Sequence, residues 1–310
     1  MIKKTLCFSN PAYLSLSKGQ LVIKLPEIER NETLPDTFKR NAVRTIPIED
    51  IGIVLLDNKQ ITVTQGVLEA LLENNSAVIS CDSSHMPVGL MLPLEGHTLQ
   101  SERFRSQIDA SLPLKKQLWQ QTIQAKITNQ ATALHKLYKC EVGNMRAWSR
   151  EVRSGDPDNY EARAASYYWY NFFPTIPEFI RGREEQPPNN LLNYGYAILR
   201  AVIARSLVSS GLLPTLGIHH HNRYNAYCLA DDIMEPYRPY VDMLVAEIVR
   251  ENIDISVLTP DLKARLLVIP VIEVVIDGKR SPLMISATRT TASLAACYTG
   301  EQRKIAYPVL

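Results

Sequence analysis

The chain has few cysteines and none of the spacings that cysteine sites require. Its five cysteines, at positions 7, 81, 140, 228 and 297, are odd in number and include no CxxC pair. This excludes a disulfide framework and argues against a cysteine-bound zinc site, so a reduced, cytoplasmic environment is expected.

Long hydrophobic runs and nucleotide-binding motifs are also missing. The most apolar late run, 266–276, contains Pro270 and Glu273 and is shorter than the ~20 residues of a membrane span. Pro11 and its polar neighbours interrupt the N-terminal run before it could form a signal core. The sequence contains no GxSxG, no Walker loop and no GxGxxG, so neither a hydrolase serine nor an ATP site is expected.

Charge is distributed unevenly along the 310 residues. The net charge is only +2, yet residues 101–139 hold 7 basic against 2 acidic side chains. Such a segment would attract a phosphate backbone, although a long solvated helix with spare lysines explains it equally well.

Hydrophobic periodicity divides the chain into two parts. The first 80 residues contain short apolar or alternating runs typical of strands, with Ser17-Lys18-Gly19-Gln20 as a hairpin turn and a helix over 64–74. Residues 26–44 are polar and predict a mobile loop or hairpin tip. We therefore expect an α+β protein with a β-sandwich-like domain at 1–81, a linker at 82–96 that contains one short strand, and a larger, mainly helical catalytic domain at 97–310.

From residue 97 onward, apolar residues recur at helical spacing. Asp277-Gly278 marks a late hairpin between strands at 271–276 and 283–286. The expected helices are a long one opened by Pro113, then 145–152, 159–173, a buried one at 190–209, 224–234, 236–251 and a final short one at 290–298.

One segment of this helical part collects imidazole and carboxylate side chains. His220 lies in a loop, and Asp232 and Glu235 follow at i and i+3, which places them on one helix face before Pro236. A polar histidine loop and a solvated acidic helix end are the structural alternatives. Carboxylates at a helix C-terminus oppose the macrodipole, which favours a bound cation or Arg238 as their partner.

Glu161 is a second candidate, because a helix over 159–173 would turn it toward the interior. The competing interpretation is a capping box formed with Asp158. Carboxylates plus one imidazole, without cysteine, select Mg²⁺ or Mn²⁺, and such an ion suits phosphodiester chemistry.

At these residues the chain resembles the CRISPR-associated integrase family, the first-numbered Cas endonuclease of spacer acquisition, in its type II branch. The resemblance covers essentially the whole chain. It rests on the stretches 159–165, 217–220 and 232–239, supported by 118–130, 189–196 and 281–284. It implies that Glu161, His220 and Glu235 are catalytic metal ligands. Type II members place the last ligand at the position of Glu235, whereas other branches use an aspartate nearer Asp232.

The resemblance also implies partners and a reaction. The expected assembly is a homodimer formed through the β domain, with two dimers bridged by the small ferredoxin-like second Cas protein. It would hold a double-stranded DNA prespacer, and the 3′-hydroxyl of that fragment would attack the leader-repeat boundary of CRISPR repeat DNA without ATP. The type II effector nuclease is a further candidate partner. A non-catalytic DNA-binding scaffold and a purely hydrolytic metal nuclease are the competing functions.

Basic and aromatic side chains complete the set of candidates. Trp148 and Trp169 could stack on bases, although core packing is the commoner role of tryptophan on an amphipathic helix. The candidate phosphate contacts are Arg146, Arg163, Arg181, Arg223, Arg238 and Arg289.

Overall fold

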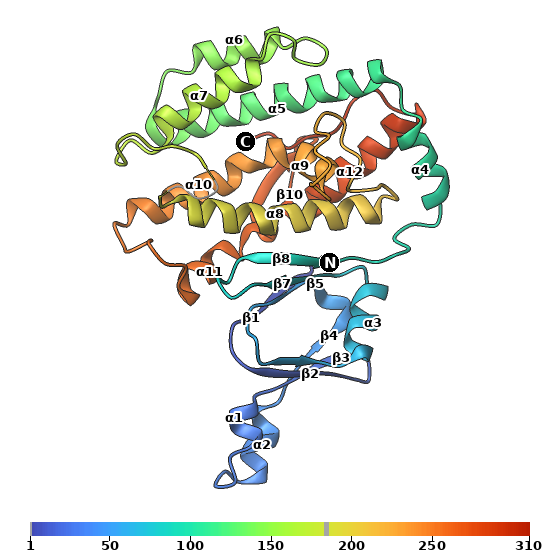
Figure 1. The fold of residues 1–310 in the computed structure, drawn as a ribbon, viewed down its shortest axis with the longest axis vertical. Coiled ribbons are helices and arrows are strands. Elements are labelled where there is room, and N and C mark those ends of the chain that lie inside the picture. The colour runs from blue at the N-terminus through green and yellow to red at the C-terminus, as the bar shows by residue number, and fades with distance from the viewer. Residues whose placement is uncertain (1, 183–185) are drawn as a thin grey trace. The chain divides into compact units, whose positions relative to one another are not determined.

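A computed structural model describes residues 2–182 and 186–310, which form two compact units, 1–94 and 95–310. Unit 1 holds two four-stranded sheets, in the orders β1-β5-β7-β8 and β4-β3-β2-β6 (Figure 1). Its elements are β1 (Lys4–Phe8), β2 (Ala12–Ser17), β3 (Gln20–Lys24), α1 (Pro26–Glu29), α2 (Asp36–Ala42), β4 (Arg44–Pro47), η1 (Ile48–Asp50), β5 (Ile51–Leu56), β6 (Ile61–Val63), α3 (Gln65–Glu73), β7 (Ala77–Cys81) and β8 (Pro87–Met91).

One hydrophobic core joins both sheets of unit 1 to α3. Leu14 and Leu21 come from the second sheet, Ile51 from the centre of the first, and Val67 and Leu71 from α3. Strand β5 pairs in parallel with β1 and β7, and five of its six residues are buried, as expected of a central parallel strand. Together with the helical unit 2, this arrangement confirms the predicted α+β class.

Two predicted hairpins form as the sequence indicates. Lys18 and Gly19 join β2 to β3, and Asp277 and Gly278 join β9 (Glu273–Ile276) to β10 (Lys279–Pro282). All four residues have positive φ, the backbone of a two-residue type I′ turn. Glycine at the second position of each turn adopts this conformation without steric cost.

Unit 2 consists mainly of helices (Figure 1), and most residues of α8 (Asn189–Ser209) are buried. By length and composition α8 could span a membrane, but 78% of its apolar window is buried inside the protein, as in the core helix of a globular fold. Besides β9 and β10, the elements are α4 (Gln100–Ile108), α5 (Leu112–Tyr138), α6 (Gly143–Glu151), α7 (Tyr160–Phe172), α8 (Asn189–Ser209), α9 (Cys228–Met234), η2 (Glu235–Tyr237), α10 (Arg238–Arg250), α11 (Pro260–Leu266), η3 (Ile269–Val271) and α12 (Leu283–Thr299).

Two local predictions were wrong, and a third was incomplete. The segment 283–286 is the first turn of α12 rather than a strand, because Pro282 ends β10 and the apolar residues that follow are buried at helical spacing. The helix predicted over 224–234 begins only at Cys228, since the Asn222 and Asn225 side chains cap turns in the preceding loop. Residues 26–44 join β3 to β4 as a hairpin tip would, yet they contain α1 and α2.

The domain boundaries expected at 81 and 97 differ in detail from the division at 94 and 95. Strand β8 lies within the expected linker and pairs antiparallel with β7, so the compact part of unit 1 reaches Leu94. The expected short strand of the linker is therefore a sheet strand.

Helix α8 packs so closely on its neighbours that Gly195 has no room for a side chain. A Cβ atom there would lie 2.6 Å from Val241 Cγ1 and 3.3 Å from Ile269 Cδ1. We predict that Gly195→Ala lowers the free energy of unfolding by about 1–3 kcal/mol, because overpacking outweighs the gain in helix propensity. Urea unfolding measures the change.

Gly143→Ala is the matched control, because a Cβ at Gly143 in the first turn of α6 meets nothing within 4 Å. It should leave stability unchanged or raise it slightly. Equal stability of the two variants would contradict the predicted steric conflict.

Candidate metal centre

The N-terminus of α7 directs Glu161 toward the protein interior. The carboxylate of Asp156 accepts the backbone N–H groups of Tyr160 and Glu161, each at 2.9 Å. Asp158 is instead paired with Arg153 at the surface. The capping-box alternative for Glu161 is therefore wrong, and its carboxylate is available for another partner.

That partner is Lys126, near the middle of α5. Lys126 Nζ lies 2.7 Å from Glu161 Oε1 and 2.7 Å from Glu235 Oε2. The two carboxylate oxygens are thus at most twice 2.7 Å apart, since they share one nitrogen. The ammonium group of Lys126 therefore lies between Glu161 and Glu235, two of the three expected metal ligands.

Glu235 is buried, with a side chain only 4% exposed. Its Oε1 also pairs with Arg238 Nη2 at 3.0 Å, one turn further along the chain. Burial raises the pKa of Glu235, but Arg238 and Lys126 outweigh it and hold the pKa below its usual value. Burial likewise lowers the pKa of Lys126, and Glu235 and Glu161 more than compensate, so that its pKa is raised. Glu235 and Lys126 are therefore charged at neutral pH.

A buried aspartate holds the histidine loop. The carboxylate of Asp232 accepts backbone N–H groups from Ile218, His219 and His220 at 2.7, 3.0 and 3.4 Å. It also lies 2.5 Å from Nδ1 of His220, and this bond is the main reason why the pKa of His220 is raised. A proton on Nδ1 leaves Nε2 of the neutral ring as the ligand atom, the arrangement typical of metal-binding histidines.

The three consecutive histidines have different surroundings. The ring of His219 stacks on Trp119 of α5, with centroids 4.2 Å apart and planes 3° from parallel. Trp119 also meets the His220 ring edge-on at 5.5 Å, whereas His221 is exposed. Helix α5 therefore supports the loop through Trp119 and the carboxylates through Lys126.

The donors suit a hard divalent cation, although they are not arranged as a closed cluster. Within 2–182 and 186–310, no group of three or more His, Cys, Asp or Glu side chains is already positioned to hold a metal ion. Three observations nevertheless favour a cation here. The Lys126 ammonium already stands in for one, and Glu235 Oε2 is buried with that ion pair but no directed hydrogen bond. Moreover, the charges of Glu235 and Glu161 both raise the pKa of His220, so the imidazole lies in their field.

The predicted phosphate contacts fall into two groups. Arg181 and Arg238 are partly buried and engaged within the protein, for example with Asn189 and Glu235. The others are exposed: Arg146, Arg163, Arg223 and Arg289. Arg223 lies over the ring of Tyr224, which is 81% exposed in the histidine loop.

Neither tryptophan considered for base stacking is fully exposed. Trp169 packs with Tyr168, Phe172 and Phe179, and Trp148 meets the ring edge of Tyr167. Both are partly buried. These contacts favour the packing role over the stacking one.

A second polar network is connected to the site through Arg238. Asp242 of α10 accepts hydrogen bonds from the hydroxyls of Tyr168 at 2.9 Å and Tyr196 at 2.5 Å. The Tyr196 ring is in contact with the guanidinium groups of both Arg181 and Arg238, 5.1 and 4.9 Å from its centroid. Burial raises the pKa of Asp242 to about 7, while the two hydroxyls and the arginines oppose this shift.

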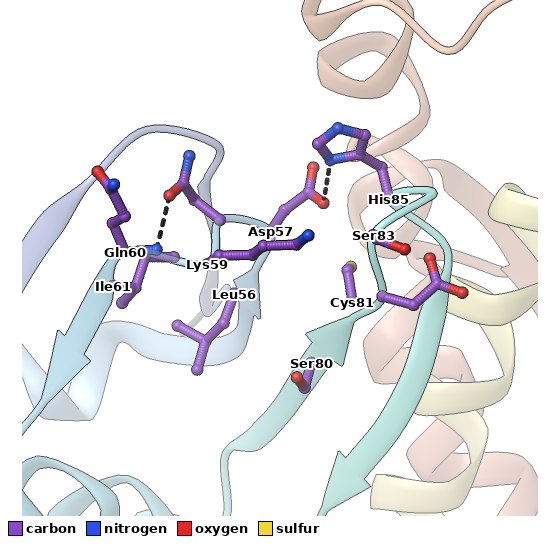
Figure 2. Close-up of a pocket in the computed structure, with 11 residues that line it drawn as sticks. Leu56, Asp57, Lys59, Gln60, Ile61, Ser80, Cys81, Ser83 and His85 are labelled. Atoms are coloured by element: carbon purple, nitrogen blue, oxygen red, sulfur yellow. Dashed lines mark hydrogen bonds and ion pairs between the residues drawn. The ribbon is translucent and has the colours of Figure 1, made fainter.

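Unit 1 contains a cavity of about 660 Å³ at the carboxyl ends of β5 and β7 (Figure 2). His85 Nδ1 lies 2.8 Å from the buried Asp57 carboxylate across its rim. Lys59, Cys81 and Asp82 are also part of the lining. Unit 2 has a similar imidazole–carboxylate pair in His220 and Asp232, but there two further carboxylates also share one cation. The charge arrangement therefore singles out the site in unit 2.

Comparison with known proteins identifies the family. The family model described as CRISPR associated protein Cas1 matches residues 6–257. The chain belongs to the Cas1 family. A relative from Neisseria meningitidis serogroup C (strain 8013), named CRISPR-associated endonuclease Cas1, is 32% identical over 310 residues, which cover 98% of this chain and 95% of that protein.

Solved structures share the Cas1 fold seen here. A casposase bound to integration product has a TM-score of 0.76 at 20% identity, covering 98% of this chain and 92% of its own. A Cas6-RT-Cas1–Cas2 complex gives 0.72 at 20% identity, covering 97% of this chain and 35% of that one. The predicted family is confirmed, and the name of the Neisseria relative, an endonuclease, agrees with the predicted enzyme class. The roles of individual residues rest on the geometry above.

Lys126 and Trp119 contact the candidate site residues and were not predicted from the sequence. They are seven positions apart on α5 and both are buried. A lysine within the apolar stripe of a long helix was the available signal, since buried lysines are rare unless they are paired.

Gly217 permits the close approach that shapes the histidine loop. A Cβ atom there would lie 2.3 Å from the His220 carbonyl oxygen and 2.8 Å from Asp232 Oδ2. We predict that Gly217→Ala displaces His220 and lowers metal-dependent DNA cleavage roughly 100-fold, a typical cost of a misplacement of about 1 Å. Cleavage rates and melting temperatures, with Gly143→Ala as the control, measure the effect. If Gly217→Ala cleaved DNA at the wild-type rate, this steric role would be ruled out.

Asp242 should make stability depend on pH. Its pKa is about 7 in the folded protein, against 3.8 for the unperturbed group. Between these values the folded state retains a proton that the unfolded state loses, so this contribution to stability falls as pH rises from about 4 to 7. In Asp242→Asn this loss should disappear. As pH rises, the unfolding free energy of the wild type should therefore fall relative to that of the variant. The relative change should be a few kcal/mol, at about 1.4 kcal/mol per pKa unit.

Urea unfolding of both proteins at pH 5 and pH 8 tests this. At pH 5 the folded wild type keeps the proton on Asp242, and both the carboxylic acid and the asparagine amide then offer a carbonyl acceptor and a donor, so the two proteins should be closest in hydrogen bonding at this pH. A stability difference that is the same at both pH values would contradict the assignment.

Proposed function

We propose that Glu161, His220 and Glu235 bind Mg²⁺ or Mn²⁺ and that the chain uses this site to insert DNA fragments into a CRISPR array. The observation that carries the proposal is the pair of carboxylates from α7 and η2 held around a single cationic group. When bound, the ion would polarise the scissile phosphodiester and favour deprotonation of the attacking hydroxyl.

The surrounding side chains fix the orientation of the proposed ligands. Arg238 holds Glu235, and Asp232 holds both the loop and Nδ1 of His220. Asp232 was also considered as a ligand, but its oxygens already receive three backbone N–H groups and the imidazole. We therefore assign it a positioning role, with Glu235 as the third ligand.

The reaction is a transesterification. The 3′-hydroxyl oxygen of the fragment forms a bond to phosphorus at the leader-repeat boundary, and the 3′-oxygen of the leader strand leaves. One phosphodiester is exchanged for another, so no ATP is required. The exposed Arg146, Arg163, Arg223 and Arg289 are proposed to contact DNA phosphates.

The assembly is proposed from family membership and from the structural neighbours. Unit 1 would form a homodimer, and two dimers would be bridged by the second Cas protein, in keeping with the solved Cas6-RT-Cas1–Cas2 complex. A double-stranded prespacer and the CRISPR repeat would be the DNA partners, which agrees with the casposase bound to integration product. The type II effector nuclease is a further proposed partner, and the compartment is the prokaryotic cytoplasm.

A non-catalytic DNA-binding scaffold is the second candidate function. The observation in its favour is that Lys126 fills the space between Glu161 and Glu235. If this lysine kept metal ions out permanently, the site would be structural.

Strand transfer by the Glu161→Gln and Glu235→Gln variants distinguishes these functions. Loss of either carboxylate should reduce joining of a DNA 3′-end to a repeat substrate at least ~100-fold, because the charge that binds the ion is removed. DNA binding should change little. Joined products in Mn²⁺ or Mg²⁺ are separated on denaturing gels, with a chelator control and with Glu102→Gln, an exposed carboxylate on α4, as the matched variant.

Full joining by Glu161→Gln would falsify the proposal. Metal-dependent cutting without joining would instead indicate a hydrolytic nuclease with water as the nucleophile. DNA binding by the wild type without cutting or joining under any divalent metal would favour the scaffold.

A further inference from the structure

Lys126 is buried in an environment that would suit a metal ion. Its side chain is 9% exposed and contacts Glu161, which is 24% exposed, and Glu235, which is 4% exposed. The ammonium and a divalent ion would need the same oxygen atoms. Because both are cations, they repel each other and cannot share that space in a buried site.

The charged side chains of the site balance one another. Two carboxylates, Glu161 and Glu235, face two cations, Lys126 and Arg238. Without Lys126, the two carboxylates would lie close together with only Arg238 as a counter-charge, and their repulsion would favour protonation or separation. The lysine therefore preserves the ligand arrangement while no metal is present.

We propose that Lys126 is an internal counter-cation that holds Glu161 and Glu235 in place in the metal-free protein and that the divalent ion must displace. This rests on the proposed function of those two carboxylates as metal ligands. Lys126 is thus a positioning residue that sets the metal affinity. Its four-carbon stem lets the ammonium move away without movement of α5. Glu161 marks the more exposed side of the site, and so the direction open to the displaced ammonium.

Metal binding measured without DNA tests the proposal. We expect Lys126→Met in the full chain to bind Mn²⁺ about tenfold more tightly than wild type, within the usual range of coupling between competing events. Titration followed by the electron paramagnetic resonance of free Mn²⁺ gives the affinities. Lys126→Arg, which keeps the charge, should show no gain in affinity. Lys136→Met, an exposed lysine on the same helix, should behave as wild type.

Thermal unfolding provides an independent measurement. With a chelator, Lys126→Met should melt at a lower temperature than wild type, and saturating Mn²⁺ should raise its melting temperature by more than it raises that of wild type. If the methionine variant does not fold, Lys126→Gln replaces it. This variant keeps a hydrogen-bond donor but loses the charge, and we expect the same results from it.

The outcomes separate this inference from the proposed function. If the folded neutral variants bind Mn²⁺ no more tightly than wild type, Lys126 is only structural and the inference is overturned, while the metal site stands. If neither they nor wild type bind Mn²⁺, the metal site and the inference both fail. Tighter binding that Glu161→Gln abolishes supports both.

Discussion

The carboxylate of Glu235 is buried, and a buried charge is stable only when it is paired. Its two partners come from different parts of the chain. Arg238 is supplied by the next helical turn, and Lys126 by α5, more than one hundred positions earlier. Because the same ammonium also binds Glu161, one cation links α5, α7 and η2.

Residues around this ion cluster hold its charged side chains in place. Arg238 pairs with Glu235 and stacks on Tyr196, whose hydroxyl donates to Asp242. Asp232 fixes the histidine loop in the same way, because it gathers three backbone N–H groups and the imidazole. Such outer partners restrict the orientations of the inner side chains, so a site built from a loop and three helical segments retains one geometry.

Much of the fold could be predicted from the sequence because its signals are local. Pro113 and the apolar spacing indicate α5, and Asp277-Gly278 indicates the late hairpin. The strand predicted at 283–286 failed because a short apolar run has no periodicity of its own, and only burial against the rest of unit 2 makes it helical. Motifs located Glu161, His220 and Glu235, but Lys126 and Trp119 read as ordinary helix residues, since what they face depends on tertiary packing. The N-terminal cap of α7 differed from the prediction for a related reason. Asp156 and Asp158 are both near the helix start, and the geometry of the loop decides which of them accepts the helix N–H groups.

The charge balance also connects the metal to the DNA. In the metal-free protein, Lys126 and Arg238 offset Glu161 and Glu235. A divalent ion bound at the proposed site would create an excess of positive charge, which the Lys126 ammonium would relieve only in part by moving toward the more exposed side. A DNA phosphodiester bound there would supply the negative charge that balances both the ion and the displaced ammonium. Electrostatics would therefore favour the joint binding of metal and DNA over the binding of either one alone.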